Sequence, residues 1–155
     1  MPQDAFHIRR LASELDSMLA GGRVNRVSQA DKDELALIIY TEKGALKLIL
    51  NTNASFARVC VQKTEKPPLL AAPSFCMLLR KHLSGAQLLS VKQVDNERIL
   101  ALTFLCFNDF SGGEKILYAE LMGKYSNLIL TENGLILGCL KNAPLDVATT
   151  RVTLS

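Results

Sequence analysis

The chain has 155 residues, of which 48% are hydrophobic and 21% are charged. This length and hydrophobic share predict one compact domain with its own core, and the composition excludes a disordered acidic segment. The net charge of +3, from 18 Lys and Arg against 15 Asp and Glu, permits a nucleic-acid partner without predicting one.

The first predicted element is an amphipathic helix that ends at Gly21-Gly22. Its apolar residues recur at three- and four-residue spacing from Ile8 to Leu19, which places them along one face. Asp4 is a suitable N-cap, and the glycine pair is a stop signal. Short apolar segments with turn residues between them then predict strands over Val24–Gln29, Glu34–Thr41, Ala45–Leu50 and Phe56–Val61.

A proline-containing loop separates these strands from a second helix. Lys66-Pro67-Pro68 lies in this loop, and the helix is predicted over Ser74–Leu83, with Gly85 just beyond its end. Asn133-Gly134 lies between two apolar segments and predicts a type I′ hairpin, because both residues tolerate positive φ. Further strands are predicted over Gln87–Val94, Arg98–Phe107, Lys115–Leu121, Asn127–Thr131 and Leu135–Lys141.

Two helices and about nine short strands with mostly short connections indicate an α+β fold. We expect the strands to pair antiparallel and to form a β-sandwich or flattened barrel with the two helices at its ends. Residues 1–155 are expected to form one domain. Because Ala143–Ser155 shows no clear element, we expect the chain to be a piece of a longer multidomain protein.

The cysteines and the hydropathy pattern bear on where the protein works. Cys60, Cys76, Cys106 and Cys139 stand far apart in apolar segments with no CxxC pair, which predicts buried, reduced thiols. The N-terminal sequence lacks the pattern of a signal peptide, and no apolar run has the length of a membrane span. We therefore expect a cytoplasmic protein with no membrane association.

Motifs for catalysis and metal binding are missing from the sequence. It contains no GxSxG, P-loop or GxGxxG pattern, and its two histidines, His7 and His82, have no ligand-spaced neighbours, so no metal or cofactor is expected. Pro2 could offer an N-terminal amine of the kind certain DNA glycosylases use. Those enzymes place a proton-transferring Glu next to it, whereas Gln3 cannot carry the proton. The sequence therefore predicts a protein that is not an enzyme.

Basic side chains are the better indication of a partner. Arg23, Arg80, Lys81 and Lys124 are candidates for contacts with phosphate groups. For Arg80 and Lys81 a structural explanation competes, because cations at the end of a helix favour its dipole whatever the partner. The neighbouring Glu97 and Arg98 are either a solvent-facing turn or a charged pair that projects toward a ligand, and composition does not separate the two.

Four ordered blocks of sequence resemble the NFACT family. The block Phe75–Leu83 (FCMLLRKHL) resembles a family signature, and the others are Leu19–Val24 (LAGGRV), Lys92–Leu100 (KQVDNERIL) and Glu120–Leu130 (ELMGKYSNLIL). The similarity extends from Ala5 to Lys141, and four blocks in order are far more specific than one short motif.

The resemblance implies an RNA-binding domain of a multidomain, cytoplasmic ribosome quality-control factor. Such factors bind the large ribosomal subunit, and so rRNA, when a nascent chain obstructs it. They recruit tRNA, alanine tRNA in bacteria, for C-terminal tailing of the stalled chain, while the ribosome supplies the chemistry. The fold is implied to be similar to the N-terminal domain of formamidopyrimidine-DNA glycosylases.

The resemblance also implies the site. An Asp-Arg pair tied to tRNA binding in the family falls on Glu97 and Arg98, where the acid is one methylene longer. His7 stands where some members have an Asp near the start of the first helix. We therefore expect Glu97, Arg98 and His7 to contact tRNA, while Arg23, Arg80, Lys81 and Lys124 contact the RNA backbone.

Three alternatives stay open. The first is a surface adhesin that binds fibronectin, which the missing signal pattern and the cysteines disfavour. The second is a DNA glycosylase, which Gln3 disfavours. The third is a structural module that holds other domains or the ribosome and touches no tRNA.

Overall fold

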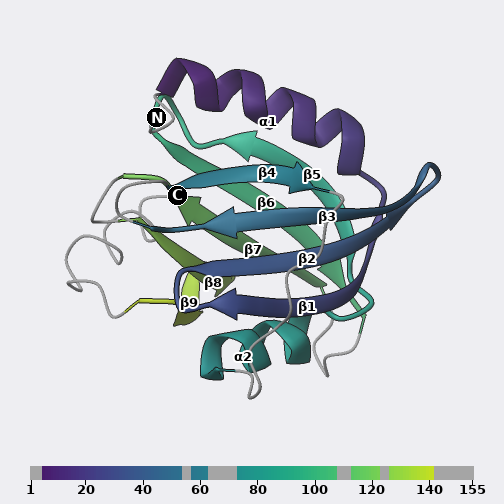
Figure 1. Cartoon of the computed structure of the whole chain (residues 1–155). Coiled ribbons are helices and arrows are strands. Elements are labelled where there is room, and N and C mark those ends of the chain that lie inside the picture. The colour runs from purple at the N-terminus through teal and green to yellow at the C-terminus, as the bar shows by residue number, and fades with distance from the viewer. Residues whose placement is uncertain (1–4, 54–56, 63–72, 108–112, 123–125, 142–155) are drawn as a thin grey trace.

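The computed structural model describes residues 5–53, 57–62, 73–107, 113–122 and 126–141 (Figure 1). Its two helices are α1 (Ala5–Leu19) and α2 (Ser74–Leu83). The nine strands within these ranges are β1 (Arg23–Asp31), β2 (Glu34–Thr41), β3 (Gly44–Asn51), β4 (Arg58–Gln62), β5 (Gln87–Gln93), β6 (Ile99–Cys106), β7 (Gly113–Glu120), β8 (Asn127–Glu132) and β9 (Leu135–Cys139).

The predicted elements are confirmed to within a few residues at their ends. Asn133 and Gly134 both have positive φ, 53° and 81°, as a type I′ turn requires. The last predicted strand ends at Cys139 instead of Lys141. The predicted features at Asp4, Phe56 and Lys66-Pro67-Pro68, and the tail from Ala143 onward, lie outside the described residues.

All strands belong to one sheet with the order β4-β3-β2-β1-β5-β6-β7-β8-β9, and every neighbouring pair is antiparallel. The pairing of β1 with β5 is the weak point, since its register holds only the pair Arg23–Gln87. Bonds such as Val24 N to Ala86 O, 2.8 Å, supplement it. The sheet therefore has two halves, β4 to β1 and β5 to β9, which meet near the C-terminal end of α1.

The two halves enclose one hydrophobic core. Leu37 of β2 and Leu102 of β6 belong to the same buried cluster, although they lie in different halves. The helix α1 packs on β5 and β6, and its buried residues Ile8, Ala12, Leu15 and Leu19 have the predicted spacing. The helix α2 packs on β1, β6 and β9 at the opposite side of the molecule (Figure 1).

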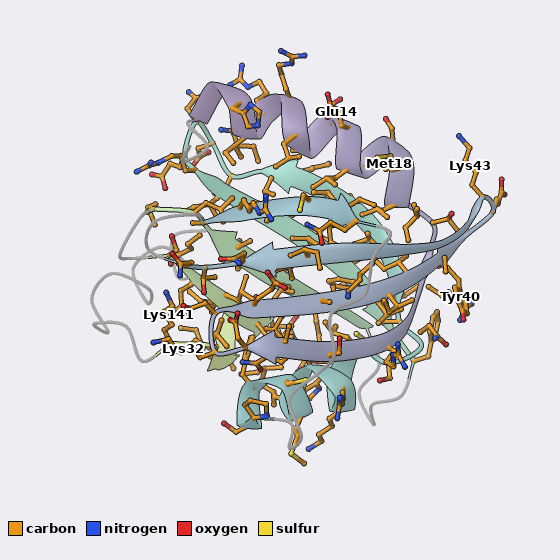
Figure 2. The ribbon with its side chains drawn as sticks, viewed as in Figure 1. Glu14, Met18, Lys32, Tyr40, Lys43 and Lys141 are labelled. Carbon is orange, nitrogen blue, oxygen red and sulfur yellow. The ribbon has the colours of Figure 1, made fainter. Side chains whose placement is uncertain are left out.

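A lysine joins the two halves of the sheet at the end remote from the β1–β5 pairing. Figure 2 labels this lysine, Lys141, far from Tyr40 and Lys43. Lys141 Nζ donates to Thr52 O over 2.6 Å and lies 3.7 Å from Asp33 Oδ1. Even so, the strand order begins at β4 and ends at β9, so the sheet is open. The expected antiparallel strands and two helices are confirmed, but the strands form one open sheet in place of the expected β-sandwich or flattened barrel. The side chain of Lys141 bridges the two halves without adding a strand pairing. The comparison with formamidopyrimidine-DNA glycosylases stays a prediction.

The cysteine prediction holds in part. Cys76 and Cys106 are buried, whereas Cys60 and Cys139 are half-buried, and all four are free thiols. Burial raises the pKa of the Cys76 thiol, against a smaller lowering effect of Arg80. Neither helix of the described ranges is long and apolar enough to cross a lipid bilayer.

Candidate functional site

The tight turn between β5 and β6 carries Glu97 and Arg98. Val94 N donates to Ile99 O over 2.9 Å and Glu97 N donates to Val94 O over 3.1 Å, which closes the turn. Asp95 has a φ of 49°, a conformation that Asp adopts more readily than most residues. We refer to residues 94–98 as the β5–β6 turn.

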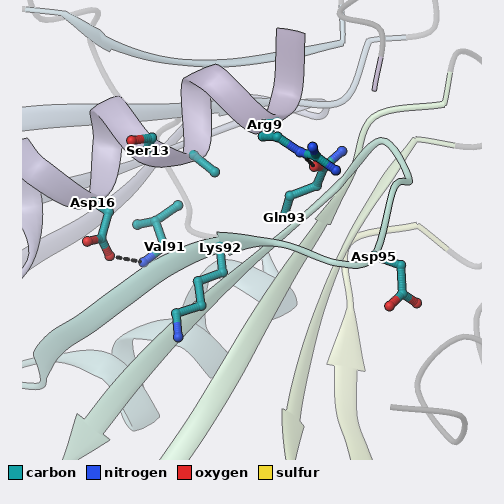
Figure 3. A pocket seen from close by; sticks show the side chains of 8 residues that line it. Arg9, Ser13, Asp16, Val91, Lys92, Gln93 and Asp95 are labelled. Atoms are coloured by element: carbon teal, nitrogen blue, oxygen red, sulfur yellow. Dashed lines mark hydrogen bonds between the residues drawn. The ribbon is translucent and has the colours of Figure 1, made fainter. Parts of the chain in front are cut away.

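The helix α1 supports this turn through Arg9. Arg9 Nε donates to Gln93 Oε1 over 3.3 Å, and its Nη2 donates to Asn96 Oδ1. Gln93 Nε2 in turn donates to Glu97 O over 2.7 Å. Figure 3 shows the side chains of Arg9 and Gln93 directed toward each other across the space between helix and strand. The main chain of Glu97 is thus tied to α1 through two side chains.

Neither predicted binding residue on the turn is enclosed by the protein. Glu97 is exposed and Arg98 is half-buried. The carbonyl oxygen of Arg98 accepts a hydrogen bond from Leu121 N over 2.9 Å, which fixes its main chain to the segment after β7. The turn therefore presents a carboxylate and a guanidinium from a main chain that is hydrogen-bonded at both ends.

A shallow groove of about 330 Å³ runs from the turn along α1 and β5 (Figure 3). Asp16 Oδ1 accepts a hydrogen bond from Val91 N over 2.8 Å, next to a register shift between Leu88 and Ser90. Arg9, Lys92 and Asp95 also line this groove, so charges of both signs surround it.

The helix α1 also carries His7. This residue is exposed and lies close to the start of α1, at the end of the helix that meets the β5–β6 turn. Residues two apart on a helix are about 200° apart around its axis, so His7 and Arg9 project to different sides. Because Arg9 is directed to the turn, His7 lies at the same end of the molecule and projects to another side of α1.

Of the other predicted residues, Arg23, Arg80 and Lys81 lie away from this turn. Arg80 Nε donates to Val27 O over 2.9 Å, so its guanidinium helps to hold α2 on β1. Lys81 is exposed on α2. Arg23 pairs with Gln87 at the opposite end of β5 from Gln93. Lys124 lies outside the described residues.

A buried carboxyl group stands near the turn. Glu120 is only 2% exposed, and this burial raises its pKa from 4.5 to about 7. It directly precedes Leu121, whose N–H bonds to Arg98 O. Within the described residues, no group of three or more His, Cys, Asp and Glu side chains is arranged to hold a metal ion.

Sequence reasoning missed the residues that hold the turn in place. Gln93 and Asn96 lie in a block that resembles the family, but the partner that joins them, Arg9, is 84 and 87 residues away in the sequence. A contact of such long range leaves no periodic signal.

Comparisons with known proteins identify the class of protein. The family model for the NFACT N-terminal and middle domains matches residues 4–155. The chain therefore belongs to the NFACT family, as its four blocks predict.

Curated relatives give the comparison more detail. The Rqc2 homolog RqcH of Streptococcus suis is 34% identical over 135 residues, 85% of this chain and 24% of the relative. The Rqc2 homolog RqcH of Bacillus subtilis is 33% identical over 136 residues. The human ribosome quality control complex subunit NEMF is 30% identical over 127 residues, 81% of this chain and 11% of the relative. The chain thus spans about a quarter of the length of the bacterial relatives.

Solved structures agree on the fold. The N-terminal domain of fibronectin-binding protein PavA from Streptococcus pneumoniae superimposes with a TM-score of 0.85 and 32% identity, over 91% of this chain and 54% of that one. The N-terminal part of the fibronectin/fibrinogen-binding protein from Streptococcus suis gives a TM-score of 0.83, also with 32% identity, over 89% of this chain and 53% of that one.

Proposed function

We propose that this chain is a non-catalytic, RNA-binding domain of a ribosome quality-control factor and that its β5–β6 turn contacts tRNA. The relatives named for Rqc2 and for the ribosome quality control complex support the cellular role. The observation that carries the contact is the turn itself. Glu97 is exposed and Arg98 half-buried on a main chain that Arg9, Gln93 and Leu121 hold in place.

The chemistry of the pair suits an unpaired nucleotide. A guanidinium stacks on a base or donates two parallel hydrogen bonds to phosphate, and a carboxylate accepts from base amino groups. Because the turn is already formed, binding orders few main-chain torsions, which lowers its entropic cost. The longer side chain of Glu97 keeps the charge of the family's Asp and extends its reach by one methylene.

The remaining features of the proposal follow from the family. The full protein acts in the cytoplasm, binds the large ribosomal subunit and its rRNA, and recruits tRNA, alanine tRNA in a bacterium, for C-terminal tailing. Peptide-bond chemistry stays with the ribosome, and this domain positions the tRNA. His7 lies at the same end of the molecule as the turn, while Lys81 on α2 adds electrostatic attraction from another side.

Crosslinking of the full-length protein to RNA in cells, followed by sequencing, tests the contact. Arg98→Ala is expected to reduce recovered tRNA by about tenfold, the effect of losing one charge-assisted hydrogen-bonding group. Arg58→Ala removes an exposed arginine from the edge strand β4 and serves as the matched control, with unchanged recovery. Glu97→Asp restores the family's acid and is expected to retain binding. Equal tRNA recovery from the Arg98→Ala and wild-type proteins would mean that the β5–β6 turn does not contact tRNA.

A second candidate function is binding of fibronectin, because the structural relatives from two streptococci carry that name. Curated relatives from the same two species are named for Rqc2, so the names alone do not decide. The two functions are distinguished by measuring how much of one preparation of full-length protein is retained on immobilised fibronectin and on immobilised tRNA. Saturable capture by fibronectin that Arg98→Ala does not change, together with no retention on tRNA, would favour the adhesin.

A further inference from the structure

A second hollow lies at the other end of α1. It has a volume of about 890 Å³ and is bounded by the C-terminal end of α1, the Gly21-Gly22 turn, the start of β1 and the β2–β3 hairpin. We refer to it as the hairpin hollow. Met18, Tyr40 and Lys43, which line it, stand around this end of the molecule in Figure 2.

Two flat side chains face the hollow from neighbouring strands. Arg23 of β1 and Tyr40 of β2 are direct partners in the antiparallel register, so their side chains lie on the same face of the sheet. The Arg23 guanidinium carbon lies 5.2 Å from the centroid of the Phe107 ring, within the range of a cation–π contact. Arg23 Nη1 also donates to Gly85 O over 3.4 Å. The guanidinium is therefore supported from more than one side.

Packing does not account for these aromatic residues. Tyr40 and Phe107 are each 53% exposed and Met18 is 46% exposed, so they contribute little to the core. Single exposed apolar residues are ordinary, but here Tyr40 and a flat cation line one hollow, and a second half-exposed ring, Phe107, contacts that cation. This combination is the one that proteins use to stack unpaired bases.

The surroundings favour RNA over a protein segment. An extended peptide needs a long free strand edge, yet β2 is paired on both sides, and β3 is paired with β2 from Gly44 to Asn51 and with β4 from Lys47 to Asn51. Among the described strand pairings, only the three residues Gly44–Leu46 of β3 have no second partner strand, which is too short an edge for an added strand. Arg23 and Lys43 supply positive charge to the lining, against one carboxylate from Glu42. A helix that docks through an apolar face needs a continuous apolar groove, whereas this lining mixes glycine, hydroxyl and charged groups.

We propose that the hairpin hollow binds a single-stranded RNA segment by stacking an unpaired base on Tyr40, with Arg23, backed by Phe107, and Lys43 facing its phosphates. The segment is distinct from the nucleotide contacted by the β5–β6 turn. Arg23 pairs with Gln87 and the turn follows Gln93, so the two contacts lie about 20 Å apart along β5. The proposal rests on the RNA-binding function but not on the tRNA contact of Arg98.

The test uses the full-length protein and a single-stranded RNA oligomer with one 2-aminopurine, whose fluorescence falls when the base stacks. Tyr40→Ala is expected to weaken binding about tenfold and to abolish the quenching, whereas Tyr40→Phe keeps both. Leu135→Ala removes an exposed apolar side chain from β9, where Leu135 is 71% exposed against 53% for Tyr40, and is the control. Arg98→Ala is expected to leave this quenching intact.

The outcomes separate this inference from the function on which it rests. If Arg98→Ala abolishes tRNA binding but Tyr40→Ala leaves affinity and quenching unchanged, the hollow is not an RNA site while the proposed function stands. If Tyr40→Ala reduces association with ribosomes without changing oligomer binding, the hollow takes a protein segment and the RNA assignment is overturned. If the wild-type protein binds no RNA of either kind, the function itself fails.

Discussion

The two ends of α1 present contrasting surfaces. At its N-terminal end, Arg9 is bound to Gln93 and Asn96, and the β5–β6 turn has a shallow groove beside it. At its C-terminal end, the half-exposed Tyr40 lines a hollow nearly three times as large, and the half-exposed Phe107 contacts Arg23 of its lining. At the N-terminal end, polar contacts fix the main chain of the β5–β6 turn. At the C-terminal end, flat side chains lie beside an open hollow. One helix can therefore support two modes of recognition, one through oriented charges and one through stacking.

The largest expected effect concerns pH at the turn end. Glu120 has a pKa of about 7 in the folded protein and 4.5 as its ordinary value, so between these two pH values the folded state holds a proton that the unfolded state has lost. The free energy of unfolding therefore falls as pH rises from 4.5 to 7. Glu120→Gln removes this effect. We expect its free energy of unfolding to exceed that of the wild type by about 3 kcal/mol at pH 8 and to equal it at pH 4.

Denaturant unfolding at a series of pH values measures this difference. Glu114→Gln on the same strand changes an exposed carboxyl and is the control. A constant difference between wild type and Glu120→Gln across the series would contradict a burial effect at the turn end.

The next effect concerns the floor of the hairpin hollow. A Cβ at Gly22 would lie 2.6 Å from Ile39 Cγ2 and 3.0 Å from Leu19 O, and Ile39 is fully buried. Gly22→Ala is expected to lower the free energy of unfolding by about 2 kcal/mol, because neither neighbour can move away freely. A Cβ at Gly21 would have no other atom within 4 Å, but Gly21 has a φ of 89°. Gly21→Ala is therefore expected to lower the free energy of unfolding by about 1 kcal/mol. Thermal unfolding of both variants shows which one loses more stability. A larger loss of stability for Gly21→Ala would mean that backbone strain outweighs packing at this turn.

A smaller effect tests whether α1 organises the turn. Arg9→Ala removes the donors to Gln93 and Asn96 and is expected to cost less than about 1 kcal/mol, since all of these groups are near solvent. The amides of Val94 and Glu97 should nevertheless exchange their hydrogens faster, because the turn they close is no longer held. Arg10→Ala changes the exposed neighbour on the same helix. Equal exchange in both variants would show that the turn is rigid without Arg9.

The smallest effect separates stacking from charge at the hollow. Lys43→Gln is expected to reduce the salt dependence of single-stranded RNA binding by about 0.7 in the slope of log K against log salt concentration. Tyr40→Ala should change the affinity and leave that slope unaltered. Titrations at several salt concentrations measure both, and a slope change for Tyr40→Ala would assign it an electrostatic role.

The sequence was informative where structure is local. Periodicity located α1 and α2, and residues with positive φ, such as Gly21 and the pair Asn133-Gly134, located the turns. The family resemblance directed attention to Glu97 and Arg98, which lie together on an accessible turn.

Long-range contacts were beyond the reach of such patterns. Arg80 was predicted to contact phosphate, and no pattern in the sequence indicated that its Nε donates to Val27 O across a span of 53 residues. Lys115 stood at the start of a predicted strand, yet its side chain is fully buried and lies 3.0 Å from Glu132. The cation–π contact of Arg23 with Phe107 likewise depends on how β1 packs beside β5. No spacing of residues in the sequence predicts that packing.

The hydrogen bond from Val91 N to Asp16 has a consequence for the reach of the molecule. It fastens the last turn of α1 to the second half of β5, between the two contact sites, which limits sliding of the helix along the strand. A stacked strand rises about 3.4 Å per nucleotide, so a strand that made both proposed contacts would need about six nucleotides between them. Oligomers shorter than this should engage one end at a time, and lengthening them past six should raise the affinity abruptly.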